Sequence, residues 1–324
     1  MEYTTLGETG LEVSRIAVGC GRFGRNDEAK LADEAAAELV DRAIDLGINV
    51  FDTANSYGRG DSEEILGRAL AGYDRDWPVV ATKGYFEMDA ANPNASGLSR
   101  KAIEQELADS LERLGMETVD LYQIHRWDYD TPVHETLRTL DDAVRRGQAR
   151  YLGASSMFAY QFAEALRTSD RLGLERFVSM QNHYNLVYRE EEREMLPYCA
   201  TRGIGVVPWS PLARGFLARP LSEQAATPRG ARVSDSDRWQ VYRSNGGDEI
   251  NERVQELAAE YGVSMAQLAL AWVLHQDAVD APIVGTSSIE HLEEAVEALD
   301  ISLSSSDQAY LEEPYEPTPV TGHS

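Results

Sequence analysis

Cysteine, lysine and long apolar runs are all scarce in this chain of 324 residues. Cys20 and Cys199 are too few for a disulfide framework and lack the paired spacing of a zinc site. Nowhere do about 18 apolar residues follow one another, and the first residues show neither the basic nor the apolar part of an export signal. These absences predict no disulfide scaffold, no membrane span and no export, so a cytoplasmic location is expected.

Basic residues are also in deficit, because 55 acidic side chains face 30 basic ones and the formal net charge is −25. A surface of this sign repels nucleic acid and anionic membranes, so neither is expected as a partner. Only three of the basic residues are lysines, and an acidic, lysine-poor shell suits molar salt, where the Debye length falls to about 3 Å. We expect a salt-loving microbial source, and 43% hydrophobic residues argue for a folded chain.

What the chain does contain is a regular alternation of short β-branched runs with longer segments of helical period. One such segment spans residues 99–114, with its apolar side chains on one face and Gly115 as a stop signal. Eight runs are expected as strands: 16–19, 49–52, 79–83, 119–124, 149–154, 177–181, 205–208 and 282–284. Eight such units predict a single domain over residues 1–324, a (β/α)8 TIM barrel of class α/β.

Two further segments complete the prediction. Residues 4–6 and 11–13, joined by a Gly-containing turn, are expected to form an N-terminal β-hairpin that plugs the barrel floor. Residues 210–248 are rich in Arg, Ser, Gly and Pro and only weakly periodic, which predicts a long functional loop.

A competing fold has to be weighed, because Gly19, Gly21 and Gly24 match the G-x-G-x-x-G fingerprint of a Rossmann domain. That fingerprint needs a helix with an apolar face opening at the glycines. Residues 25–30 are polar and loop-like instead, which favours the barrel with a tight turn at its rim.

Lys83 stands out because it ends an apolar strand in a chain that contains so few lysines. An unpaired buried ammonium is too costly to keep, so Lys83 must be paired or catalytic. In a barrel the carboxyl ends of the strands converge on one rim, where Asp52, Lys83 and His125 would meet. Further polar groups follow the later strands: Ser155, Ser156, Gln181, Asn182, Trp209 and Ser210.

Tyr57 lies five residues beyond Asp52, so the same loop can fold it over the barrel mouth. A phenol has an ordinary pKa of about 10, and a neighbouring Lys83 ammonium would lower that pKa by stabilising the phenolate. Asp52 would keep Lys83 charged, and His125 could hydrogen-bond the same substrate oxygen. Asp52 and Lys83 could also be a purely structural ion pair, but Tyr57 and His125 at matching positions favour a catalytic site. No second ligand accompanies His125 at metal-binding spacing, so we predict no metal.

This arrangement resembles the aldo-keto reductase superfamily over nearly the whole chain. The order and spacing of Asp52, Tyr57, Lys83 and His125 match the catalytic tetrad of that family. Supporting stretches are Phe51-Asp52-Thr53-Ala54-Asn55-Ser56-Tyr57-Gly58, Leu111-Glu112-Arg113-Leu114-Gly115, Val119-Asp120-Leu121-Tyr122-Gln123-Ile124-His125 and Trp209-Ser210-Pro211-Leu212-Ala213-Arg214-Gly215. The resemblance implies an NAD(P)H-dependent oxidoreductase that reduces an aldehyde or ketone to an alcohol by hydride transfer, with Tyr57 as the general acid.

The resemblance also implies a set of cofactor contacts. Ser155, Ser156 and Gln181 should contact the nicotinamide carboxamide, although the family often has Asn where Ser156 stands. Trp209 should stack on the nicotinamide, and Ser210, Leu212 and Gly215 should lie along the pyrophosphate.

The adenosine end of the expected site is read from residues 285–291. Ser287 and Glu290 form a capping box, so a helix N-terminus suited to a phosphate should begin there, next to Gly285. Ser287 and His291 could serve as neutral donors in place of the Arg or Lys that many relatives carry. On this basis NADP(H) is preferred to NAD(H) as the expected cofactor.

Two other functions stay open beside the reductase. One is a nicotinamide-binding regulatory or accessory protein with slow turnover, and the other is a metal-dependent barrel isomerase or hydrolase. The substrate is expected to be a small carbonyl compound. No exposed apolar stripe stands out, so the sequence leaves the oligomeric state open. Four aromatic residues and one methionine on rim loops could form a substrate wall or only pack: Phe23, Tyr85, Phe86, Trp127 and Met157. The other histidines are expected on the surface or on helices (His134, His275, His323), apart from His183 beside a strand end.

Overall fold

Eight parallel strands form the centre of the molecule in the computed structural model, which describes residues 1–24, 31–224 and 241–323. The strands are β3 (Ala17–Gly19), β4 (Val50–Asp52), β5 (Val79–Gly84), β6 (Val119–Ile124), β7 (Ala149–Ser155), β8 (Phe177–Gln181), β9 (Gly205–Val206) and β10 (Ile283–Val284). Their order in the sheet is β10-β3-β4-β5-β6-β7-β8-β9. Each of the eight expected strands is present.

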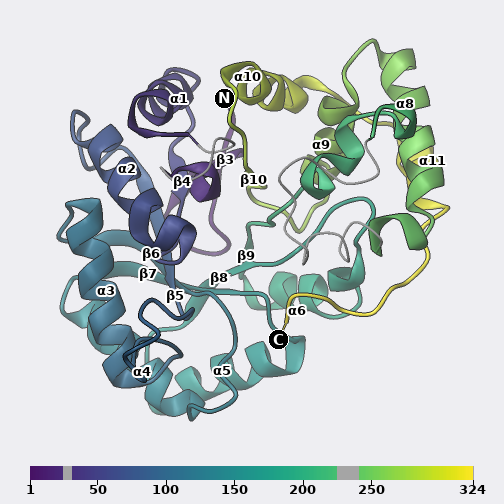
Figure 1. The fold of residues 1–324 in the computed structure, drawn as a ribbon. Helices are drawn as coiled ribbons and strands as arrows, with labels where there is room; N and C mark the ends of the chain where they lie inside the picture. The colour runs from purple at the N-terminus through teal and green to yellow at the C-terminus, as the bar shows by residue number, and fades with distance from the viewer. Residues whose placement is uncertain (25–30, 225–240, 324) are drawn as a thin grey trace.

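The sheet closes on itself between its first and last strands. The Ile283 amide donates to the Pro208 carbonyl at 2.8 Å, and the Asp280 amide donates to Val206 at 2.9 Å. Figure 1 shows the resulting ring of strands with helices around it, as expected for a (β/α)8 barrel. This closed architecture excludes the Rossmann alternative. Gly19 ends β3, Gly21 lies within the short 3-10 helix η1 (Cys20–Arg22), and Gly24 follows that helix.

The outer layer consists of helices that follow the strands. They are α1 (Asp33–Asp45), α2 (Asp61–Leu70), α3 (Arg100–Leu114), α4 (Val133–Arg145), α5 (Ala159–Leu172), α6 (Met195–Arg202), α8 (Gly247–Tyr261), α9 (Met265–Leu274), α10 (Ile289–Glu297) and α11 (Ser305–Glu312). Helix α3 begins after Ser99, whose hydroxyl accepts the Ala102 amide, and ends at Gly115 in the left-handed region, as its sequence predicts.

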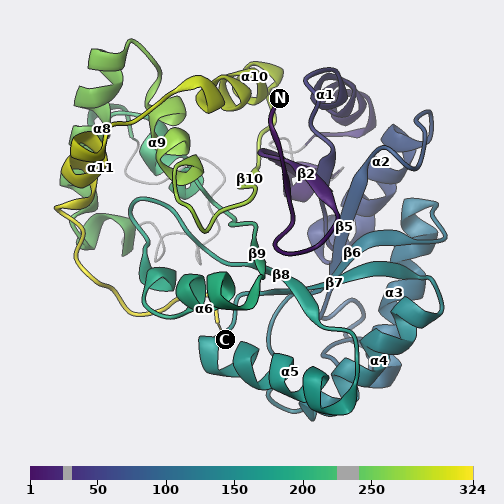
Figure 2. The same cartoon turned by 180° about the vertical axis from the view of Figure 1, so that it is seen from behind.

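The expected N-terminal hairpin is present as β1 (Tyr3–Thr5) and β2 (Glu12–Ser14), paired antiparallel. Its turn carries Leu6, which is 2% exposed and packs with apolar side chains from the amino ends of the barrel strands. Gly7, at φ +55°, approaches so closely that an added Cβ would lie 2.4 Å from the Gly205 nitrogen. The hairpin therefore covers the end of the barrel that is in front in Figure 2.

The expected long loop, residues 210–248, contains regular structure in the parts that the structure describes. It contains two 3-10 helices, η4 (Ala213–Ala218) and η5 (Leu221–Glu223), and the first residues of α8. Residues 225–240 of this segment lie outside the described residues.

Among the described residues no single helix has the length and apolar character to cross a membrane. Helices α8 and α9 reach that length only together, and they meet at a bend of 99°.

Truncating the floor plug should destabilise the barrel. We expect Leu6→Ala to lower the free energy of unfolding by about 2–5 kcal/mol, because it leaves a cavity under the strands. Urea unfolding measures this cost. Leu11→Ala, at a half-buried position of the same hairpin, is the control and should cost less. Equal costs for the two variants would contradict the plugging role of Leu6.

Candidate active site

The four side chains expected at the rim lie together at the carboxyl end of the barrel. Lys83 Nζ is 2.6 Å from Asp52 Oδ2 and 3.4 Å from Tyr57 Oη. The rings of Tyr57 and His125 meet edge to face, with centroids 5.7 Å apart. The Lys83 ammonium thus lies between a carboxylate and a phenol, a geometry in which its charge can act on the phenolic oxygen.

The charge on Lys83 is maintained by its surroundings. Its side chain is fully buried, which by itself lowers the pKa of the amine, but the Asp52 carboxylate and the Tyr57 hydroxyl raise the pKa above its ordinary value. Nζ also donates to the Thr53 carbonyl at 2.8 Å. Lys83 is therefore a buried cation with three oxygen partners.

His125 is held neutral beside this cation. Burial, followed by the charges of Lys83 and Arg126, lowers the pKa of its imidazole well below the ordinary value. Its Nδ1 is buried without a hydrogen-bond partner among the described residues, and Phe86 packs edge-on against the ring at 4.8 Å. A neutral imidazole of this kind can bond to a substrate oxygen without adding charge.

Two glutamines that converge on Asp52 keep its carboxylate oriented. Gln123 Nε2 donates to Asp52 Oδ1 at 3.0 Å, and Gln181 Nε2 donates to the same oxygen at 2.8 Å. Gln123 was not among the expected site residues. It lies one residue before the end of β6, and the alternation of side chains along a strand could have indicated that it faces the barrel interior. The amide nitrogen of Gln181 thus faces the tetrad.

The loop that carries Tyr57 is fixed from below. Asn55 donates its backbone N–H to the Lys83 carbonyl at 3.1 Å and its side-chain amide to Glu106 on α3 at 2.7 Å. The chain then turns through positive φ at Gly58, Arg59 and Gly60 before α2 begins. Anchoring before Tyr57 and a sharp turn after it leave the phenol over the barrel mouth.

A polar shelf follows β7 and β8. Ser155 Oγ donates to the Gln181 carbonyl at 2.8 Å, and the Ser156 N–H donates to Asn182 Oδ1 at 3.2 Å. Trp209 Nε1 donates to Ser156 Oγ at 3.1 Å. These contacts join the residues expected around a nicotinamide into one surface, and Asn182 belongs to it although its role was not predicted.

Trp209 is the outermost member of a stack of three rings. His183 lies parallel to Trp209 at 4.2 Å and parallel to Tyr188, also at 4.2 Å. Tyr242 Oη lies 2.8 Å from His183 Nε2. Such stacking fixes the plane of the indole, so Trp209 is a rigid wall of the shelf.

Backbone strain is concentrated on this face of the barrel. In the described chain the non-glycine residues at positive φ are Arg59, Ser156, Ser210, Ala213 and Arg214. Each lies in a loop after a strand, and three of them belong to the segment expected along a pyrophosphate. Conformations of this kind cost about 1–3 kcal/mol each and cluster at functional sites. Nothing in the composition of these loops signals this strain.

At the expected adenosine end the capping box was placed one residue too early. Helix α10 begins after Ser288, whose Oγ accepts the His291 N–H at 3.4 Å, while Ser287 is exposed. The Thr286 hydroxyl accepts the Ser288 N–H at 3.0 Å, which shifts the start of the helix. Ser287 and His291 nevertheless both lie at the surface of this helix N-terminus, next to Gly285.

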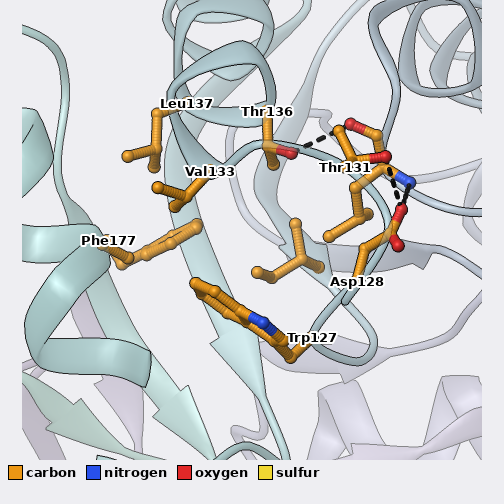
Figure 3. Close-up of a pocket in the computed structure, with 10 residues that line it drawn as sticks. Trp127, Asp128, Thr131, Val133, Thr136, Leu137 and Phe177 are labelled. Atoms are coloured by element: carbon orange, nitrogen blue, oxygen red, sulfur yellow. Dashed lines mark hydrogen bonds between the residues drawn. The ribbon is translucent and has the colours of Figure 1, made fainter. Parts of the chain in front are cut away.

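The expected substrate wall is only partly at the rim. Phe86 contacts His125, whereas Phe23 and Met157 are fully buried in the core. Trp127 lines a cavity of about 10 Å³ next to β6. Figure 3 shows Val133, Thr136 and Phe177 among the other residues that line it. This cavity has room for about one water and does not coincide with the tetrad.

His323 was expected on the surface but is only 6% exposed. Its burial results from a long-range contact that the C-terminal sequence does not signal. Among the described residues no three His, Cys, Asp or Glu side chains are grouped to hold a metal ion.

Asp52→Asn should destabilise the protein, because it leaves the buried Lys83 ammonium without its carboxylate partner. Removing one partner of a buried ion pair costs about 3–5 kcal/mol, so the free energy of unfolding should fall by that amount. Adding Lys83→Met should recover part of the loss, as denaturant unfolding would show. Glu293→Gln, which breaks the half-exposed pair with Arg42, is the control and should cost less than about 1 kcal/mol. A loss as small as that of the control would show that Lys83 does not depend on Asp52.

The lowered pKa of His125 predicts a pH-dependent stability. Below about pH 6.5 the imidazole of His125 is protonated in the unfolded chain but stays neutral in the folded protein. Wild type therefore loses stability as the pH falls from there towards the pKa of folded His125. His125→Gln lacks this contribution. The stability of wild type relative to the variant should therefore decline between about pH 7 and pH 5 in urea titrations. A constant difference would contradict a buried neutral imidazole.

Comparison with known proteins agrees with this geometry. The model of the Aldo/keto reductase family matches residues 15–316. Versiconal hemiacetal acetate reductase of Aspergillus parasiticus is 40% identical, over 99% of this chain and 98% of its own. A Schizosaccharomyces pombe protein that is provisionally named an aryl-alcohol dehydrogenase is 41% identical, over 99% of this chain and 97% of its own. The chain therefore belongs to the aldo/keto reductase family.

Proposed function

We propose that this family member is an NAD(P)H-dependent carbonyl reductase in which Tyr57 is the general acid. The observation that carries the proposal is the buried Lys83 ammonium between Asp52 at 2.6 Å and the Tyr57 hydroxyl at 3.4 Å, in a family whose members are reductases and dehydrogenases by name. A purely structural ion pair would not need a half-exposed phenol within reach of its cation.

In the proposed reaction the substrate carbonyl oxygen lies between Tyr57 Oη and the neutral His125 ring. Tyr57 donates its proton to that oxygen, and the Lys83 ammonium stabilises the phenolate that remains. Asp52 keeps Lys83 protonated, as the raised pKa of the amine indicates. His125 orients the oxygen, and in the direction of alcohol oxidation the proton returns to Tyr57.

The loops on this face fit a dinucleotide. The backbone at Ser210, Ala213 and Arg214 has positive φ, a conformation that recurs in anion-binding loops. An added Cβ at Gly285 would meet nothing within 4 Å, so a ligand can approach the main chain there. Residues that would hold it are Ser155, Ser156, Gln181 and Trp209 at the nicotinamide, Ser210, Leu212 and Gly215 at the pyrophosphate, and Gly285, Ser287 and His291 at the adenosine. When bound, the nicotinamide supplies the hydride.

We propose NADP(H) as the preferred form of the cofactor. Ser287 and His291 are both exposed at the N-terminus of α10, where neutral donors and the helix dipole can receive a 2′-phosphate. Glu290, in the first turn, works against this preference, so the ratio of the two affinities is the decisive measurement.

An aromatic carbonyl compound is the substrate class we propose. Phe86 packs edge-on against His125 and Tyr85 packs against Phe86, which gives the expected position of the carbonyl an aromatic border. The name of the S. pombe relative points in the same direction.

The proposed setting is a reducing, salt-rich cytoplasm. Both cysteines are buried free thiols, and the net charge of −25 suits strong screening. Measurements are therefore best made in about molar KCl.

Tyr57→Phe should abolish reduction and leave cofactor binding nearly intact. We expect kcat for an aromatic aldehyde to fall by about 10²–10⁴-fold, because the variant removes the transferred proton and little binding surface. NADPH and NADH affinities, from titrations followed by tryptophan quenching, should change less than about threefold.

Tyr73→Phe is the matched control, because it removes a phenolic hydroxyl that bonds to Asp41 on the outer surface. Loss of nucleotide binding in Tyr57→Phe would contradict the roles assigned here. Tight nucleotide binding by wild type without turnover of any carbonyl compound would favour a regulatory or accessory function.

A further inference from the structure

The C-terminal segment after α11 crosses the carboxyl-end loops of the barrel and ends near α6, as the yellow trace in Figure 1 shows. The Tyr315 hydroxyl and the Thr318 N–H both donate to Glu190 Oε1, each at 2.8 Å. The Thr321 N–H donates to Tyr188 Oη at 2.9 Å. Residues 313–323, which we call the C-terminal strap, are thus attached at several points to the segment that follows β8.

The end of the strap reaches the nicotinamide shelf. His323 packs edge-on against Phe158 with centroids 4.9 Å apart, and its Nε2 lies 3.0 Å from Glu191 Oε1. Gly322 lies against the indole, since a Cβ added to it would be 3.7 Å from Trp209 Cζ2. The strap therefore borders Trp209 and buries His323 at the same time.

Glu191 connects the strap to the shelf. Its Oε2 accepts the side-chain amide of Asn182, whose Oδ1 accepts the N–H of Ser156 at 3.2 Å. Ser156 is one of the strained residues, at φ 49°, and its hydroxyl accepts the Trp209 indole N–H. One carboxylate thus links the last turn of the chain to the residues expected around the carboxamide.

Because the Glu191 carboxylate is buried, it needs both of its hydrogen-bond partners. Glu191 is 4% exposed, and a buried carboxylate is stable only while its oxygens are hydrogen-bonded. His323 supplies the partner of one oxygen and Asn182 that of the other. If the strap leaves, Glu191 loses the partner of one oxygen, and the Asn182 side chain that accepts the Ser156 N–H loses part of its support.

We infer that Glu191 is a positioning residue for the nicotinamide shelf and that His323, on the C-terminal strap, holds it in place. The inference rests on the proposed function, in which Ser156 and Trp209 contact the nicotinamide. Glu191 and His323 touch neither the reacting atoms nor the tetrad among the contacts described above. Their loss should therefore weaken cofactor affinity and leave the chemical step largely unchanged.

The test compares His323→Phe, His323→Gln and a chain ending at Val320. His323→Phe keeps an aromatic ring against Phe158 but removes the partner of Glu191. It should raise the dissociation constant of NADPH roughly tenfold, the ratio expected for losing one hydrogen bond to a charged group, and the truncation should raise it at least as much. His323→Gln keeps a side-chain N–H donor for Glu191 and should restore the affinity to within about twofold of wild type. At saturating NADPH, kcat should stay within about twofold in each variant.

Tyr129→Phe is the matched control, because the Tyr129 hydroxyl touches the His323 carbonyl at 3.5 Å without touching Glu191, and its affinity should be unchanged. A second readout needs no nucleotide. The indole N–H resonance of Trp209 should shift in His323→Phe, while that of Trp272, which donates to Glu312, should not.

The outcomes separate this inference from the proposed function. Wild type that binds neither NADPH nor NADH overturns both. Wild type that binds, with His323→Phe and the truncation binding equally well and the Trp209 resonance unmoved, overturns the positioning role alone. A lowered melting temperature with unchanged affinity would assign the strap to stability only and would also overturn it.

Discussion

The buried ion pair between Lys83 and Asp52 is the constraint on which the site depends. An ammonium with no solvent exposure is tolerable only with its charge balanced, and Asp52 in turn accepts hydrogen bonds from Gln123 and Gln181. These contacts cross from β5 to β4, β6 and β8, so four strands have to be in register for the pair to exist. The closed barrel supplies that register, so the buried charge of Lys83 can exist only in the folded barrel.

The strands are short, and the loops do much of the positioning. Asp52, Lys83 and Gln181 lie at or next to the last residue of a strand, where the barrel passes into a loop. Tyr57, Ser156 and the residues from Ser210 to Arg214 lie beyond the strands, where the backbone is strained or sharply turned. The ion pair is thus positioned by the strands, whereas the expected ligand contacts are positioned by strained loops.

The sequence predicted the regular part of this arrangement well, because strands and helices follow from local periodicity. The eight strand runs, the α3 boundaries and the N-terminal hairpin need only neighbouring residues to be recognised. Failures occurred where a distant contact decides. His323 is buried by Glu191, 132 positions away, and Gln123 faces Asp52 across 71 positions. The start of α10 was misplaced by one residue because the Thr286 hydroxyl accepts the Ser288 N–H and Ser288 caps the helix, and composition does not distinguish Ser288 from Ser287 as the cap.

The scarcity of lysine acquires a structural meaning from the ion pairs. In the described part of the chain arginine is the cation of each ion pair between a basic and an acidic side chain, apart from the pair of Lys83 with Asp52 and the contact of His323 with Glu191. Arginine forms broad, bidentate contacts and keeps its charge, which suits a chain with so many acidic side chains. An arginine could not replace Lys83, because the guanidinium is wide and planar. The amine of Lys83 is compact enough to lie 3.4 Å from the Tyr57 hydroxyl, where its charge can promote transfer of the phenolic proton. Lys83 therefore remains where a compact charge is required, and the general depletion of lysine elsewhere makes that requirement visible in the sequence.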